Sequence, residues 1–72
     1  MYINENIVLR EDLPEKLKSE FQILQEYYDA DDWLMFDIYL EAFEATVKAH
    51  YIAGKISMED LRRIFERYGI PH

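Results

Sequence analysis

The segment from Asp32 to Ala53 most constrains how this chain can fold, because it is apolar around most of a helical circumference. At helical spacing its interior charged residues share one narrow arc, made of Asp37, Glu41, Glu44 and Lys48. Two apolar flanks border that arc, one largely aromatic and one rich in alanine. They consist of Trp33, Phe36, Tyr39, Leu40, Phe43, Val47 and Tyr51, and of Leu34, Ile38, Ala42, Ala45, Ala49 and Ile52. A helix with two apolar flanks is buried on several sides, so we expect it at the centre of the fold.

A preceding amphipathic helix is expected over residues 13–28. Its apolar residues recur three or four positions apart and form one stripe: Leu13, Leu17, Phe21, Leu24 and Tyr28. Its start predicts Asp12 as N-cap, Pro14 in the first turn and Glu15 closing a capping box. Residues 29–32 offer a new N-cap, so the central helix over 32–53 is expected to run antiparallel to the first. An uninterrupted helix through residues 29–32 is the alternative.

A third helix is expected over residues 57–68. Gly54 suits the left-handed end of the central helix, Ser57 suits an N-cap with Asp60 at N3, and Gly69 suits the final C-cap. The buried stripe of this helix is Leu61, Ile64, Phe65 and Tyr68. The turn and the acidic helix start after it are similar to the short helical hairpin motif, of the SHOCT type, in bacterial proteins. Capping explains these shared residues, so the resemblance implies no function.

These elements predict an all-α fold: a small three-helix domain, with a helical hairpin, a shorter C-terminal helix and an extended N-terminal arm over residues 1–12. We expect residues 1–72 to form one domain. A chain of this length buries only about 60% of its unfolded surface, and it has no cysteine for disulfides. Self-association is a common support for such a small core. We therefore expect a homodimer packed mainly through residues 32–53.

The charge of the chain is strongly negative and unevenly distributed. The formal net charge is −7, and no Lys or Arg occurs between Ser19 and Val47. Phosphates would be repelled, so we expect no direct nucleic-acid binding and no membrane binding. The N-terminal residues lack a basic leader, and no apolar run approaches the roughly 20 residues of a membrane span. We expect a cytoplasmic protein.

No sequence motif indicates catalysis or metal binding. Residues 49–60 resemble a calcium loop in outline, but Ala49, Tyr51 and Ala53 occupy three ligand positions without a carboxylate. A DNA-binding helix-turn-helix motif is disfavoured, because the central helix is too long and the net charge of the chain is negative. His50 lacks a recognisable nucleophile and orienting partner. We therefore expect no enzyme, no catalytic residue, no cofactor and no metal.

The expected function is that of a non-enzymatic protein interaction or regulatory module, which binds itself or another protein. The candidate partner-binding residues are Trp33, Met35, Tyr39, Ala42, Ala45 and Ala49. The alternative is an acidic nucleic-acid mimic that inhibits a nucleic-acid-binding protein. Its candidate surface consists of Asp29, Asp31, Asp32, Asp37, Glu41 and Glu44.

Overall fold

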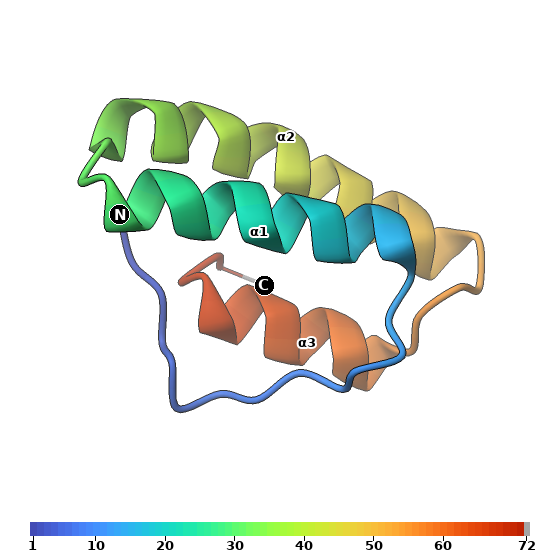
Figure 1. Cartoon of the computed structure of the whole chain (residues 1–72). Helices are drawn as coiled ribbons and strands as arrows, with labels where there is room; N and C mark the ends of the chain where they lie inside the picture. Colours follow the sequence, from blue (N-terminus) through green and yellow to red (C-terminus); the bar gives the residue numbers. More distant parts are fainter. Residues whose placement is uncertain (72) are drawn as a thin grey trace.

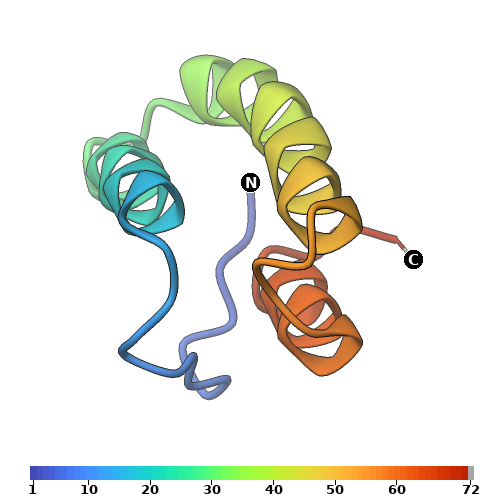
Figure 2. The ribbon, with the colours of Figure 1, turned by 90° about the vertical axis from the view of Figure 1, so that its right-hand side faces the viewer.

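The computed structural model describes residues 1–71, which form three helices joined by short turns (Figure 1). Helix α1 spans Glu15–Asp29, α2 spans Trp33–Ile52 and α3 spans Met58–Arg67. No strand occurs within these residues, so the all-α, three-helix prediction is confirmed. Every helix boundary lies one or two residues from its predicted position. Figure 2 shows α1 and α3 on two sides of α2, with the N-terminal arm in the space between α1 and α3.

The start of α1 differs from the predicted capping box. Pro14 is the N-cap residue, and no side chain caps the helix. Pro14 keeps an extended backbone with ψ of 141° and occupies the N-cap position, so Asp12 lies two positions before the cap and does not reach the first helical amides. The Asp12 carboxylate instead lies 2.8 Å from the Arg10 guanidinium. The predicted cap at Asp12 is therefore wrong, and the helix begins after the proline.

The turn between α1 and α2 is broken at Asp31, so the hairpin forms rather than one continuous helix. Asp31 adopts a left-handed backbone with φ of 57°. The Asp32 amide donates a hydrogen bond to the Tyr27 carbonyl and closes α1. The Asp32 carboxylate accepts one from the Met35 amide at 3.2 Å and caps α2. The predicted N-cap at this join is confirmed.

The turn between α2 and α3 has the predicted end of one helix at Gly54 and the predicted N-cap of the next at Ser57. Gly54 has φ of 74°, and the Lys55 amide donates to the His50 carbonyl, which closes α2. The Ser57 hydroxyl accepts a hydrogen bond from the Asp60 amide, and the Asp60 carboxylate accepts one from the Ser57 amide, each at 3.0 Å. This capping box is confirmed.

The core is built around the aromatic flank of α2. Phe43 is fully buried, and its ring centroid lies 5.7 Å from that of Phe21 in α1 and 5.2 Å from that of Tyr68 after α3. Phe36 and Val47 are also fully buried on this flank. The surrounding helices and arm supply the other buried apolar residues: Ile3, Leu13, Leu17, Leu24, Ile56, Leu61, Ile64, Phe65 and Ile70. Aromatic contacts between the helices therefore join all three elements through α2.

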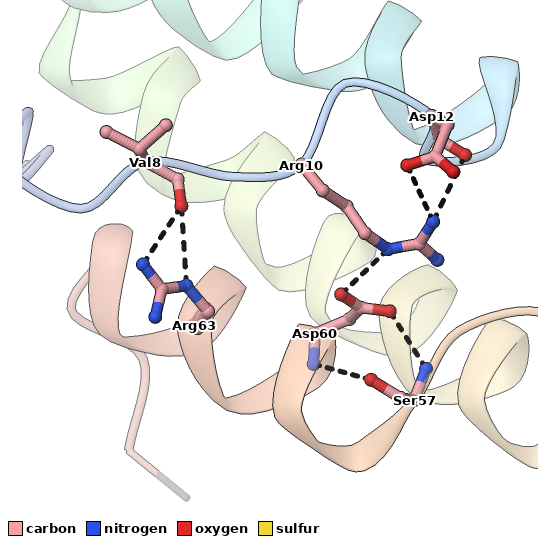
Figure 3. Close-up of polar contacts among 6 residues, drawn as sticks. All are labelled: Val8, Arg10, Asp12, Ser57, Asp60 and Arg63. Atoms are coloured by element: carbon pink, nitrogen blue, oxygen red, sulfur yellow. Dashed lines mark hydrogen bonds and ion pairs between the residues drawn. The ribbon is translucent and has the colours of Figure 1, made fainter.

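The N-terminal arm is extended and is tied to α3 by arginine side chains. The Arg67 guanidinium donates to the Ile7 carbonyl at 2.7 Å, and the Asn4 amide donates to the Arg67 carbonyl at the same distance. The Arg63 guanidinium donates two hydrogen bonds to the Val8 carbonyl (Figure 3). These bonds hold the arm across the gap between α1 and α3.

The last arm contact joins Arg10 to the capping box of α3. The Arg10 Nε donates to an Asp60 carboxylate oxygen at 3.0 Å, while the other Asp60 oxygen accepts from the Ser57 amide (Figure 3). This arginine hydrogen bond holds the pKa of the Asp60 carboxyl below its usual range. One carboxylate thus both caps α3 and anchors the arm.

Candidate functional site

The two apolar flanks of α2 have opposite fates in the structure. The aromatic flank faces α1, α3 and the arm, and its middle residues Phe36, Phe43 and Val47 are inaccessible to solvent. No other segment lies over the opposite side of α2 in Figure 2. That side carries the alanine flank, which is exposed throughout, whereas the aromatic flank is buried in its middle and exposed at its ends, Trp33 and Tyr51.

The open side of α2 forms a continuous apolar stripe, which we call the outer face. It consists of Met35, Ile38, Ala42, Ala45, Ala49 and Ile52. All six residues are exposed, and the large ones reach 54% at Ile38 and 83% at Ile52. Single exposed apolar residues are common on proteins, whereas a contiguous apolar stripe is a candidate binding surface.

The spacing of the outer face runs three, four, three, four and three residues from Met35 to Ile52. This is the period that keeps side chains on one seam between two packed helices. Ile38 and Ile52 were not among the candidate residues chosen from the sequence. The same spacing was the signal that could have identified them, because it extends the alanine positions to both ends of α2.

The candidate partner-binding residues do not all lie together. Met35, Ala42, Ala45 and Ala49 belong to the outer face, and Trp33 is exposed beside its first turn, at 62%. Tyr39 lies elsewhere, half-buried between α1 and α2 with its ring centroid 6.1 Å from that of Tyr27. Burial, and then the negative charge of nearby Glu20, raise the pKa of Tyr39.

Charged residues border the outer face along one edge. Glu41 and Lys48 are exposed two turns apart on α2, and neither has an ion-pair partner within residues 1–71. The Lys48 ammonium lies 6.0 Å from the centroid of the Phe65 ring, at the outer limit of a cation–π contact. Both side chains are long and exposed, so both can reach across the edge to a bound partner.

The candidate acidic residues divide into two groups. Asp29, Asp31 and Asp32 lie at the α1–α2 turn, where Asp29 accepts a hydrogen bond from Gln25 and Asp32 caps α2. The other three, Asp37, Glu41 and Glu44, lie along α2, where Glu44 is only partly exposed and Lys48 shares their arc. Two of the six carboxylates are therefore already engaged in local hydrogen bonds.

The remaining polar side chains that could serve chemistry are bound to the protein itself. The His50 Nδ1 lies 2.8 Å from the Thr46 carbonyl oxygen, and the Thr46 hydroxyl donates to the Ala42 carbonyl. Arg63 and Arg67, which a DNA-reading helix would present, bind the arm. No group of three or more His, Asp or Glu within the described chain is arranged to hold a metal ion.

A shallow groove of about 610 Å³ runs between the arm and α1. Leu9, Phe21 and Tyr68 line its floor, and the Arg67 guanidinium at its edge is engaged by the arm carbonyls. The groove is thus an edge of the core where the arm crosses it. Polar and charged residues also line it: Glu5, Arg10, Glu11, Lys18, Gln22 and Gln25.

Among residues 1–71, no helix combines the length and the apolar character that crossing a lipid bilayer requires. No protein-family model, no curated protein and no solved structure matches this chain.

Proposed function

We propose that this chain is a non-enzymatic protein interaction module, and that it associates with itself through the outer face of α2. The observation that carries the proposal is the exposure of an apolar stripe along the length of a helix whose opposite side is packed at Phe36, Phe43 and Val47. Within this stripe, Ile38 and Ile52 are each more than half exposed. Burying such a stripe against a partner removes apolar surface from water. This stabilises the complex by about 25 cal/mol for each Å² of apolar surface buried.

The size of the domain supports self-association. A core supplied by three short helices and an arm has little stability in reserve, and a second copy adds buried surface without adding sequence. Homodimers with two-fold symmetry are the commonest soluble oligomers. The local hydrogen bonds of His50 and Thr46 support a binding role over a catalytic one, because both side chains satisfy their own helix.

Size-exclusion chromatography with light scattering, at low and high ionic strength, tests this proposal. We expect a mass about twice the monomer mass of 8.7 kDa, retained at high salt because burial of apolar surface is insensitive to screening. A monomer at every concentration up to several hundred micromolar would contradict the proposed self-association.

The competing proposal is the acidic mimic, whose exposed carboxylates would complement a basic protein site. Of the six candidate acids, Asp31, Asp37 and Glu41 are exposed and make no side-chain hydrogen bond, and the Asp37 carboxylate lies 3.9 Å from the N-terminal ammonium of Met1. Binding of that kind weakens steeply as salt rises, since it depends on attraction between charges. A monomer that captures a basic nucleic-acid-binding protein only at low salt would favour the mimic instead.

A further inference from the structure

We infer that the outer face binds the outer face of a second copy in an antiparallel arrangement, with a two-fold axis that passes between Ala42 and Ala45. This inference rests on the proposed self-association and specifies its geometry. In this arrangement three kinds of contact repeat on both sides of the axis: Met35 against Ile52, Ile38 against Ala49, and Ala42 against Ala45. All six outer-face residues are then paired, and none is left uncovered.

The sizes of these side chains suit the antiparallel pairing. At the axis, alanine meets alanine, so the two helix backbones can approach closely. One turn further out, the large Ile38 meets the small Ala49 of the second copy, which keeps the separation constant. The large Met35 and Ile52 close the two ends. A parallel arrangement in register would place Ile38 against itself and Ala49 against itself, with crowding at one level and a void at the other.

The charges along the edge of the outer face distinguish the two orientations more strongly. In an antiparallel pair, Glu41 of each copy lies beside Lys48 of the other, and this contact occurs twice. In a parallel pair, Glu41 lies beside Thr46 and Lys48 beside Ala53, so no opposite charges meet. Edge residues of this kind set the orientation of packed helices.

The ends of α2 are also complementary. Its N-terminal end carries Asp31 and Asp32, and its C-terminal end is followed by Lys55. Antiparallel packing brings the acidic end of one copy to the basic end of the other, whereas parallel packing brings like charges together. The dipoles of the two helices favour the same orientation.

The fold leaves room for this arrangement. α1 and α3 lie on the inner side of α2, so neither obstructs a helix laid along the outer face (Figure 2). A helix of this length is about 30 Å long, and a contact about 10 Å wide buries roughly 300 Å² in each copy. The total of roughly 600 Å² is below the usual range for stable interfaces, so we expect a weak dimer with a dissociation constant of roughly tens to hundreds of micromolar.

Mixing two single-cysteine variants tests the orientation, since the chain itself contains no cysteine. We would combine Ile38→Cys with Ala49→Cys in a glutathione buffer and weigh the disulfide-linked dimers by mass spectrometry. The antiparallel pairing predicts that the mixed disulfide exceeds either self-disulfide by about tenfold, because only that pair is close. Two copies of the same position are separated by about 16 Å along the helix axis, which is too far for a disulfide. Val8→Cys, on the exposed arm, is the matched control.

A charge exchange gives a second measurement that needs no cysteine. Glu41→Lys and Lys48→Glu should each raise the dissociation constant of the dimer, by about tenfold, since like charges then meet twice. An equimolar mixture of the two variants should restore dimerisation, because each then supplies what the other lacks. The double variant E41K/K48E should also dimerise like the unmodified chain.

The outcomes separate this inference from the proposal on which it rests. A dominant mixed disulfide and restoration by mixing support the antiparallel dimer. Dominant self-disulfides, or a dimer that is indifferent to both charge changes and yields no disulfide above Val8→Cys, overturn the antiparallel arrangement while self-association stands. A monomeric unmodified chain at several hundred micromolar overturns both.

Discussion

The aromatic flank of α2, here called the inner flank, and the alanine flank, here called the outer flank, contain similar numbers of apolar residues. Only the inner flank has residues that are buried within one chain. The inner flank carries the rings of Phe36 and Phe43, which reach far enough to contact α1 and the end of α3. The outer flank is mostly alanine at its centre, and alanine can contact only a helix that approaches closely. Side-chain size, more than hydropathy, thus separates the flank that organises the fold from the flank that is open to a partner.

The largest expected effect comes from truncating the inner flank at its centre. Phe43→Ala removes a fully buried ring that contacts Phe21 and Tyr68, so we expect a loss of about 3–5 kcal/mol in the free energy of unfolding. That is most of the stability of a domain this small, and much of the chain should unfold. Urea denaturation followed by far-ultraviolet circular dichroism measures it.

The matched control on the outer flank is Ile38→Ala, measured on the dilute monomer. Ile38 is 54% exposed, so we expect the monomer to lose less than about 0.5 kcal/mol. Its dimerisation should nevertheless weaken. Equal destabilisation of the monomer by both variants would break the comparison, because it would mean that Ile38 is packed inside the single chain.

The arm covers part of the inner flank, and Arg67 holds the first residues of the arm. Arg67→Ala removes hydrogen bonds to the Asn4 and Ile7 carbonyls, so we expect a loss of about 1–3 kcal/mol. Hydrogen exchange should accelerate at the Asn4 and Ile7 amides, which are bonded in the folded arm. Arg62→Ala, at an exposed position on the same helix, should change neither quantity. Unchanged exchange in the Arg67 variant would show that the arm is held by other contacts.

Substituting the two glycines, Gly54 and Gly69, distinguishes the cost of backbone strain from the cost of a clash with the arm. Gly54→Ala and Gly69→Ala both place a side chain on a left-handed residue, which costs about 1–2 kcal/mol at each site. At Gly69 the added Cβ would also lie 2.9 Å from the Tyr2 ring, whereas at Gly54 it meets nothing. We expect Gly69→Ala to be the more harmful by a few tenths of a kcal/mol, and Tyr2→Ala to remove the difference. Thermal melts of the two glycine variants, each with and without Tyr2→Ala, measure this difference.

The α1–α2 turn decides whether the inner flank can face α1 at all. Asp31 has φ of 57°, which glycine adopts without strain, so we expect Asp31→Gly to stabilise the fold by about 0.5–1 kcal/mol. If α1 and α2 formed one continuous helix, glycine would lie in its interior and cost about 1 kcal/mol. The sign of the change in melting temperature therefore distinguishes a hairpin from a continuous helix.

The smallest expected effect is a dependence of stability on pH through the arm anchor. Arg10 lowers the pKa of Asp60, so the stabilisation is complete above the unfolded pKa of about 3.9 and is lost as pH falls through the folded value. Arg10→Gln should reduce the difference in unfolding free energy between neutral and acidic solution. A variant with unchanged acid sensitivity would show that this ion pair does not anchor the arm.

Most of the helical framework could be predicted from the sequence, because its signals are local. The capping box at Ser57, the left-handed Gly54 and the N-cap at Asp32 each depend on residues a few positions apart. The start of α1 could not be predicted in the same way. There the Asp12 carboxylate had two possible partners, and the extended backbone of Pro14 favoured Arg10 over the helix.

The candidate surface was predictable only in part. The sequence identifies two apolar flanks on one helix, but it does not say how much of each the rest of the chain covers. That depends on where the arm lies, and the arm is positioned by long-range bonds from Arg63 and Arg67 to backbone carbonyls, which carry no sequence pattern. Tyr39 illustrates the consequence, since it was expected at a partner surface and lies between α1 and α2.

The most direct test of the central claim is light scattering of the unmodified chain beside Ala45→Glu over a wide range of concentration. Ala45 is exposed in the monomer and adjoins the two-fold axis of the inferred dimer, so the glutamate leaves the fold intact and places a charge in the interface. We expect the unmodified chain to dimerise. The variant should remain a monomer, with a mass close to 8.7 kDa and the same helix content. Equal association of both chains, or association of neither, would contradict the claim that the outer face of α2 is the interface.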